Sequence, residues 1–123
     1  MTAFSDITRL PEFEKDLKKL KKRFPTLDDD LKVFLSVQLP LFHKLNKDNQ
    51  GIVPIAGLGI DQPKMYKARK FACKALKGRG ANTRLRVIYT YFEAEDRVEL
   101  VEMYFKGDKE NEDKGRILKK YSE

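Results

Sequence analysis

The sequence contains one cysteine and one histidine, so it offers few metal ligands and few groups for nucleophilic catalysis. The lone cysteine, Cys73, excludes an internal disulfide, and no Cys, His or Asp stands at metal-ligand spacing from His43. Cys73 has no histidine near it in sequence, so we expect it to be a small buried hydrophobic residue. We expect His43 to be a surface or helix-terminal residue, with a catalytic role only if the chain folds back onto it. The sequence therefore predicts no metal site.

Long apolar runs are also absent. No segment approaches the roughly 20 apolar residues that a membrane-spanning helix needs. Residues 1–9 lack the apolar run behind basic residues that is typical of a signal peptide. We therefore expect a cytoplasmic protein with no membrane partner. No internal repeat is visible, and a length of 123 residues is enough for one domain with a real core. The chain 1–123 is interpreted as a single domain.

Two glycine-containing stretches do not match nucleotide-binding motifs. Gly57-Leu-Gly59 lacks the third glycine and the strand–turn–helix setting of a dinucleotide fingerprint, and residues 77–83 have too few spaced residues for a P-loop. We therefore expect no cofactor. The segment 51–63 is apolar but interrupted by prolines and glycines. It is interpreted as an ordered loop that packs its isoleucines against the core, or alternatively as a lip that binds a partner.

The charge balance is basic. Twenty-six Lys and Arg residues stand against 19 Asp and Glu residues, which gives a net charge of +7. This balance favours an anionic partner, such as a nucleic acid or an acidic protein segment. The alternative is that the charge serves only solubility, and composition alone does not separate the two.

Two amphipathic helices are predicted after a short edge strand within Ala3–Thr8. Pro11 suits the first turn of the first helix, where its missing N–H is not needed. The lysines of this helix fill a face that we expect to be solvated. Its apolar residues recur at helical spacing and are Phe13, Leu17, Leu20 and Phe24. Thr26 is the expected N-cap of the second helix, whose stripe is Leu27, Leu31, Phe34, Leu35, Leu41 and Leu45. Pro40 kinks or ends that helix. The pair is expected to form an antiparallel hairpin.

A β-hairpin is predicted from two runs rich in β-branched and aromatic residues, 84–93 and 97–106. Pairing Glu93 with Arg97 across a three-residue loop sets Tyr89 opposite Val101, Val87 opposite Met103 and Leu85 opposite Phe105. That face is apolar. The other face then forms a mostly basic platform: Arg84, Arg86, Ile88, Thr90, Leu100, Glu102, Tyr104 and Lys106. A slip of one residue would place Glu102 among apolar side chains, so this register is favoured.

A further strand is predicted over Met65–Leu76, with an uneven alternation that suggests a bulge or an edge position. Gly107 is expected to end the second arm of the hairpin. A last helix is expected from Asp108 or the charged residues after it, with a thin apolar stripe of Ile117, Leu118 and Tyr121. Because this stripe is thin, the helix is expected to dock on the rim of the sheet or to become better ordered with a partner.

The predicted order is strand, helix, helix, three strands and a short helix. This order resembles the RelE/ParE toxin superfamily, and in particular its RelE- and HigB-like members. The resemblance covers most of the chain from about Leu10 onward and is weakest in residues 46–63. The phrases that carry it are Tyr66-Lys-Ala-Arg, Leu85-Arg-Val-Ile-Tyr and Met103-Tyr-Phe-Lys-Gly-Asp-Lys-Glu. The resemblance implies an α+β fold. An N-terminal helical hairpin would pack on one face of a small twisted antiparallel sheet, with a short C-terminal helix.

The resemblance also implies a function. Members are toxins of bacterial type II toxin–antitoxin pairs, held by a cognate antitoxin protein. RelE-like members are metal-independent endoribonucleases that cleave mRNA on the ribosome and so inhibit translation, whereas ParE-like members inhibit DNA gyrase. An endoribonuclease is the leading interpretation. There are two alternatives. One is a non-catalytic gyrase inhibitor that binds through the helical hairpin around Lys15 to Arg23, and the other is an inactive toxin-like binding domain.

Carried over position by position, the resemblance implies four catalytic residues: Lys67, Arg69, Arg86 and Lys106. Six further residues are expected to bind RNA: Lys70, Lys77, Arg79, Arg84, Tyr104 and Lys109. The tyrosine that some members carry in the C-terminal helix has no counterpart here, because its position falls near Asp113. Tyr104 and Tyr121 are the candidates to replace it.

The chemistry of metal-free RNA cleavage fits this set. It needs a base for the 2′-hydroxyl, a cation for the phosphorane and an acid for the leaving oxygen. With a single remote histidine, Lys67 is the expected base, because neighbouring cations and partial burial favour a neutral lysine. Arg69 and Arg86 are expected to clamp the phosphate, and Lys106 is expected to act as acid or as a further clamp. Alternatively, these cations form a solvated face or bind only the acidic part of an antitoxin.

Overall fold

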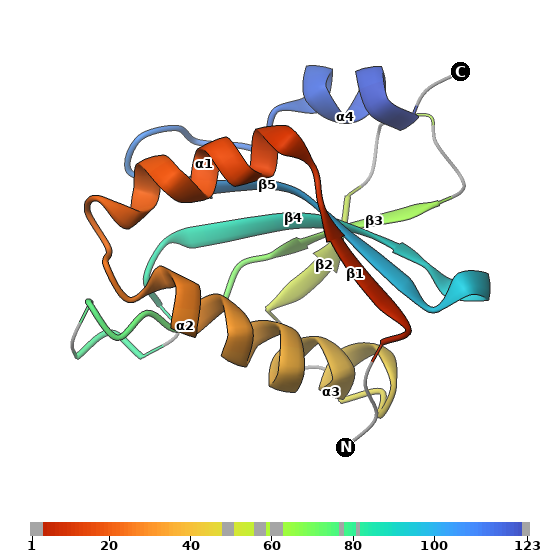
Figure 1. The fold of residues 1–123 in the computed structure, drawn as a ribbon, viewed down its shortest axis with the longest axis horizontal. Coiled ribbons are helices and arrows are strands. Elements are labelled where there is room, and N and C mark those ends of the chain that lie inside the picture. Colours follow the sequence, from red (N-terminus) through yellow and green to blue (C-terminus); the bar gives the residue numbers. More distant parts are fainter. Residues whose placement is uncertain are drawn as a thin grey trace.

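The computed structural model describes residues 4–47, 51–55, 59, 63–76, 78–80 and 82–121, and these form an α+β fold around a five-stranded mixed sheet (Figure 1). The strands are β1 (Asp6–Arg9), β2 (Ile52–Pro54), β3 (Lys64–Ala68), β4 (Leu85–Phe92) and β5 (Arg97–Phe105). The helices are α1 (Pro11–Lys21), α2 (Leu27–Val33), α3 (Leu39–His43) and α4 (Lys114–Tyr121), with a π-helical turn at Phe34–Gln38 and a 3-10 turn at Glu93–Glu95.

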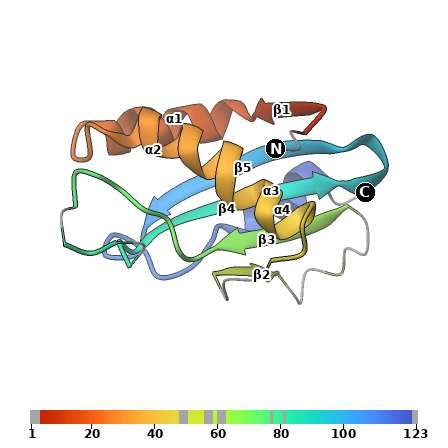
Figure 2. The ribbon, with the colours of Figure 1, turned by 90° about the horizontal axis from the view of Figure 1, so that it is seen from below.

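The sheet has the strand order β1-β5-β4-β3-β2, and Figure 2 shows β5, β4, β3 and β2 in succession. The predicted N-terminal edge strand is confirmed. The prediction of a wholly antiparallel sheet is wrong, because β1 pairs in parallel with β5. The two are joined through most of the chain, and a connection of that length allows either strand direction.

The first two predicted helices are confirmed in position. Pro11 is at the start of α1, and the second helix runs from Leu27 through the π-helical turn into α3. Pro40 explains the π-helical turn, because a residue without an N–H cannot continue the α-helical ladder and its ring crowds the turn before it. The backbone N–H of Leu39 accordingly bonds to the carbonyl of Phe34, five residues back. Leu45 lies beyond α3 and is 52% exposed, so its assignment to the apolar stripe is wrong.

Thr26 precedes α2 but does not cap it through its side chain. Its hydroxyl donates a 2.7 Å hydrogen bond to the buried carboxylate of Asp30 and accepts one from the N–H of Ala75. Asp30 also accepts the N–H of Lys74. Thr26 and Asp30 therefore fasten the loop after β3 to α2. Cys73 is buried in this loop, as predicted, and burial raises the pKa of its thiol.

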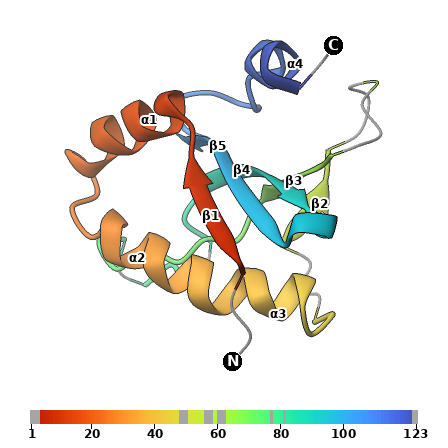
Figure 3. The same ribbon diagram turned by 45° about the vertical axis from the view of Figure 1, so that its right-hand side comes forward.

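Two apolar cores lie on the two faces of the sheet. On one face α1, α2 and α3 cover the larger core, which includes Phe13, Leu17, Leu27, Leu31, Phe34, Leu39, Phe71, Val87, Tyr89, Leu100 and Met103. On the other face α4 covers a smaller core of Leu10, Met65, Ile88, Val101, Tyr104 and Ile117. Figure 3 shows α2 and α3 on one side of the sheet and α4 on the other. The sheet is therefore buried on both faces.

The central hairpin has the predicted register only near its open end. Leu85 pairs with Phe105, Arg86 with Tyr104 and Val87 with Met103, as expected. A β-bulge then shifts the register, so Tyr89 pairs with Leu100 and not with Val101. The extra residue places Leu100 in the larger core and Val101 in the smaller one, which is how both apolar side chains become buried.

The third predicted strand is shorter than expected and has an unexpected neighbour. β3 begins at Lys64 and ends at Ala68, so the segment up to Leu76 is not part of it. The segment that was interpreted as a loop contains β2, which pairs with β3 through Ile52 and Ala68. Ile52 is buried, so the expectation that an isoleucine of this segment packs on the core is confirmed, although it does so from a strand.

Candidate functional site

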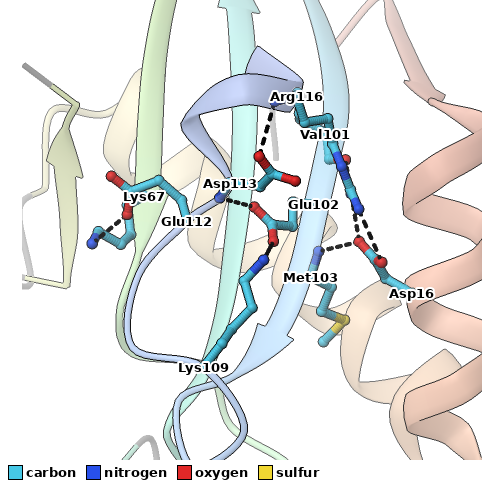
Figure 4. Close-up of polar contacts among 9 residues, drawn as sticks. All are labelled: Asp16, Lys67, Val101, Glu102, Met103, Lys109, Glu112, Asp113 and Arg116. Atoms are coloured by element: carbon cyan, nitrogen blue, oxygen red, sulfur yellow. Dashed lines mark hydrogen bonds and ion pairs between the residues drawn. The ribbon is translucent and has the colours of Figure 1, made fainter. Parts of the chain in front are cut away.

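The candidate site is built where the chain folds back after β5. Residues 106–108 form a turn, in which the N–H of Asp108 bonds to the carbonyl of Phe105 at 2.9 Å. A Cβ atom at Gly107 would lie 2.5 Å from the ring of Phe105, so a larger residue here would force that ring to shift. Residues 109–113 then cross the face of the sheet that carries α4 (Figure 4), which begins at Lys114, among the charged residues after Asp108 where a start was predicted.

Glu102 holds this returning segment to β5. Its buried carboxylate accepts the N–H of Asp113 at 2.8 Å and pairs with the ammonium of Lys109 (Figure 4). Lys109 also lies over the ring of Tyr104, 5.4 Å from its centroid. A buried charge is stable only when it is paired and hydrogen-bonded, and Glu102 obtains both from one short segment.

Glu112, in the same segment, contacts the predicted catalytic lysine. Its Oε1 lies 2.7 Å from Nζ of Lys67, and the two side chains are 7% and 19% exposed. Burial raises the pKa of Glu112, but contact with Lys67, a backbone hydrogen bond and the charge of Lys114 lower it, and the net pKa is below the ordinary value. Glu112 is therefore a nearly buried carboxylate in its charged form at neutral pH.

Two further predicted residues lie beside this pair on neighbouring strands. Arg86 of β4 and Tyr104 of β5 are cross-strand partners. Nη1 of Arg86 donates a 2.9 Å hydrogen bond to the carbonyl of Arg69, and burial lowers the pKa of Arg86, with Arg69 and Arg84 adding to the effect. Burial raises the pKa of Tyr104 to about 12, and the charges of Glu112 and Glu102 add to this.

The structure thus brings part of the predicted set together. Lys67, Arg86 and Tyr104 lie on adjacent strands, Arg69 follows the end of β3 and accepts from Arg86 through its carbonyl, and Lys109 joins them from the returning segment. Lys106 and Arg84 are exposed at the open end of the hairpin, where the N–H of Lys106 bonds to the carbonyl of Arg84. Lys70 is half-buried, and Arg79 is exposed in the loop between β3 and β4. Lys77 lies outside the described residues.

Two expectations about this face are wrong. The predicted open basic platform is largely covered, because Ile88, Thr90, Glu102 and Tyr104 are buried and Leu100 belongs to the opposite face. The neighbour of Lys67 is a carboxylate, whereas cations were expected to crowd it. Both differences have one cause. Residues 109–121 fold over this face of the sheet, whereas their thin apolar stripe predicts a helix that docks only on the rim.

Four residues of the site were missed from the sequence: Asp16, Glu102, Glu112 and Arg116. Arg116 pairs with Asp16 at 2.7 Å and donates to the carbonyl of Val101 at 3.0 Å (Figure 4). Glu112 lies in a polar stretch of the sequence, and Glu102 lies within an apolar strand, where no local pattern names its partner. One available signal is Gly107, which lets the chain turn back close to the ring of Phe105.

His43 is the last residue of α3, as predicted, but it is not a surface residue. It folds back onto the larger core, where its Nε2 lies 2.8 Å from the hydroxyl of Tyr89. Its ring also packs against Phe42, Tyr66 and Tyr91. Burial, together with the charge of Lys44, lowers its pKa to about 4. This cluster lies on the face opposite Glu112, so His43 takes no part in the candidate site.

Within the described part of the chain, no group of three or more His, Cys, Asp or Glu side chains could hold a metal ion, and no helix is long and apolar enough to cross a bilayer. A scan of protein-family models, a search of curated proteins and a search of solved structures each returned no match.

Proposed function

We propose that this protein is the toxin of a type II toxin–antitoxin pair and that it cleaves mRNA on the ribosome without a metal, with RelE-like helical-hairpin architecture. The observation that carries the proposal is the grouping of Lys67, Arg86 and Tyr104 on three neighbouring strands beside Glu112. These residues supply what a metal-free phosphoryl transfer requires, namely cations for the phosphate and groups that exchange protons.

Arg86 is the residue best suited to hold the scissile phosphate. Its guanidinium is permanently charged and has the fork geometry that matches two phosphate oxygens. One of its nitrogens is already used on the carbonyl of Arg69, which orients the group and leaves the remaining donors for a ligand. The exposed cations Arg84 and Lys106 continue the positive charge along the open end of the hairpin, where an RNA strand can follow it.

The test uses an arginine deletion with a matched control. Wild type, Arg86→Ala and Lys32→Ala would be expressed separately, and the 5′ ends of cellular mRNA would be mapped. Lys32 is exposed on α2, on the other side of the sheet, so its loss should change nothing. New 5′ ends within translated messages should appear with wild type and the control and should vanish with Arg86→Ala.

The rival function is gyrase inhibition through α1 and the residue that follows it, which present Lys15, Lys18, Lys19 and Lys22 to solvent. It predicts growth arrest with intact messages and blocked DNA supercoiling, and loss of that block when these lysines are replaced. If neither cleavage nor a supercoiling defect occurs with wild type, the chain is a toxin-like domain without either activity, and the proposal fails.

A further inference from the structure

The most unusual group in the candidate site is the carboxylate of Glu112. Its side chain is nearly buried, with 7% of its surface exposed. Its Oε1 has no well-aligned hydrogen-bond partner among the described residues, although Nζ of Lys67 lies 2.7 Å away. Contact with Lys67 and a backbone hydrogen bond stabilise its charged form. A carboxylate oxygen accepts more than one hydrogen bond, so Oε1 has the capacity for a further donor from a ligand.

The surroundings of Glu112 fit an RNA ligand. The groups that interact with it are Lys67 on β3, Tyr104 on β5 and Lys114 on α4. Tyr104 in turn pairs across the strands with Arg86 on β4 and lies near the charge of Glu102. A cation for a phosphate, Lys67, therefore lies next to an acceptor for a hydroxyl proton, and Arg86 stands on the adjacent strand. In RNA, a 2′-hydroxyl stands beside each phosphate, so one nucleotide can meet both needs at once.

We infer that Glu112 is the general base of the proposed RNA cleavage and that Lys67 is its general acid. The inference rests on the proposed function and reverses the role that the sequence suggested for Lys67. A lysine next to a charged carboxylate is placed to donate a proton, and the carboxylate is placed to take one.

The step balances without a further reactant. The Glu112 carboxylate takes the proton of the 2′-hydroxyl, the 2′-oxygen forms a bond to phosphorus, and the bond from phosphorus to the 5′-oxygen breaks. Lys67 gives its proton to the leaving 5′-oxygen. The products are a 2′,3′-cyclic phosphate and a 5′-hydroxyl. Glu112, now protonated, returns the proton to the neutral Lys67 across their contact, which restores both groups.

The experiment compares three variants with wild type in single-turnover cleavage of mRNA on programmed ribosomes. Glu112→Gln keeps the shape and removes the base. Glu112→Asp keeps a carboxylate. Glu110→Gln, at an exposed position of the same segment, is the control. Removing a general base typically lowers a rate by about 10²–10⁴-fold, so Glu112→Gln should lose at least about 100-fold in kcat with little change in KM.

The pH dependence separates a catalytic role from a structural one. Wild type, Glu110→Gln and Glu112→Asp should each lose activity at low pH as the carboxylate is protonated. The residual activity of Glu112→Gln should not show this loss at low pH. Circular dichroism spectra and thermal midpoints of all variants identify any that fail to fold. If Glu112→Gln does not fold, Glu112→Asp decides the question. The pH at which Glu112→Asp loses activity on the acid side should differ from that of wild type, and an unchanged pH overturns the inference.

Several results would overturn the inference while the proposed function stands. Cleavage by Glu112→Gln at a rate within about threefold of wild type would exclude Glu112 as the base. A faster rate would mean that Glu112 only occludes Lys67. Products with 5′-phosphate ends would exclude attack by the 2′-hydroxyl. Absence of cleavage by wild type would instead refute both the proposed function and this inference.

Discussion

The backbone N–H of Met103 donates a 3.1 Å hydrogen bond to the carboxylate of Asp16, so a helix side chain takes the place of a missing strand. β1 covers the edge of β5 only as far as Leu100. Beyond that point the edge would expose unpaired backbone groups. Asp16 accepts from Met103, and Arg116, paired with Asp16, donates to the carbonyl of Val101. α1, β5 and α4 are joined by these two side chains.

Replacing Asp16 should therefore loosen α4 as well as α1. Asp16→Ala leaves the Met103 N–H and the Arg116 guanidinium without their partner, and hydrogen bonds to charged groups contribute about 1–3 kcal/mol. We expect the free energy of unfolding to fall by about that amount in urea denaturation. Glu12→Ala, at an exposed position of the same helix, is the control and should change it by less than about 0.5 kcal/mol. Equal losses in the two variants would contradict this role of Asp16.

The register of the hairpin makes a second stability prediction. Val87 is fully buried opposite Met103, so Val87→Ala creates a cavity and should cost about 1–3 kcal/mol. Arg86 lies on the other face and donates a hydrogen bond to the carbonyl of Arg69, so Arg86→Ala should cost only about 0.5–1.5 kcal/mol. Denaturation midpoints in the reverse order would refute the pairing.

The parts that could be predicted from the sequence are those set by local patterns. α1 follows from the proline at its start and the 3.6-residue spacing of Phe13, Leu17 and Leu20. The hairpin follows from its β-branched arms, and the pairs near its open end follow from alternation. In each case the signal lies within about twenty residues, which is the range over which helix and strand periodicity operates.

The parts that could not be predicted depend on which distant segments meet. The bulge after Ile88 arises because α4 supplies a second core for Val101, and no local pattern announces that core. Likewise Glu112 gains its partner only because the chain reverses at Gly107 and lies over β3. The family resemblance points to Lys67 and Arg86, but the carboxylate beside Lys67 depends on that reversal.

His43 should make stability depend on pH. Its pKa is about 4 in the folded protein, because of burial and then Lys44, against an ordinary value of 6.5. The unfolded chain therefore binds more protons between these values, and stability is lost as the pH falls from about 6.5 toward 4. The groups that face the ring are Phe4, Phe42, Tyr66, Tyr89, Tyr91 and Lys44.

The measurement is urea denaturation at pH 7, 6 and 5. Wild type should lose about 1–2 kcal/mol between pH 7 and 5 through this residue. His43→Gln, which can still hydrogen-bond to Tyr89 but does not titrate, should be less stable at pH 7 and show a smaller dependence on pH. Parallel curves for the two proteins would mean that His43 is not responsible.

The last prediction concerns the antitoxin that the proposed function requires. With Lys67 covered by Glu112, the basic surface left open for an acidic segment lies at the end of the hairpin, around the exposed Arg84 and Lys106. Charge reversal there, in Arg84→Glu or Lys106→Glu, should weaken binding of the cognate antitoxin by about tenfold each and reduce its dependence on salt, because electrostatic contacts are screened by ions.

Lys67→Glu should weaken binding less, and Lys32→Glu, on the far side of the sheet, should leave it unchanged. Titration calorimetry at two salt concentrations gives these affinities. If Arg84→Glu and Lys106→Glu bind the antitoxin as tightly as Lys32→Glu does, the antitoxin holds another surface.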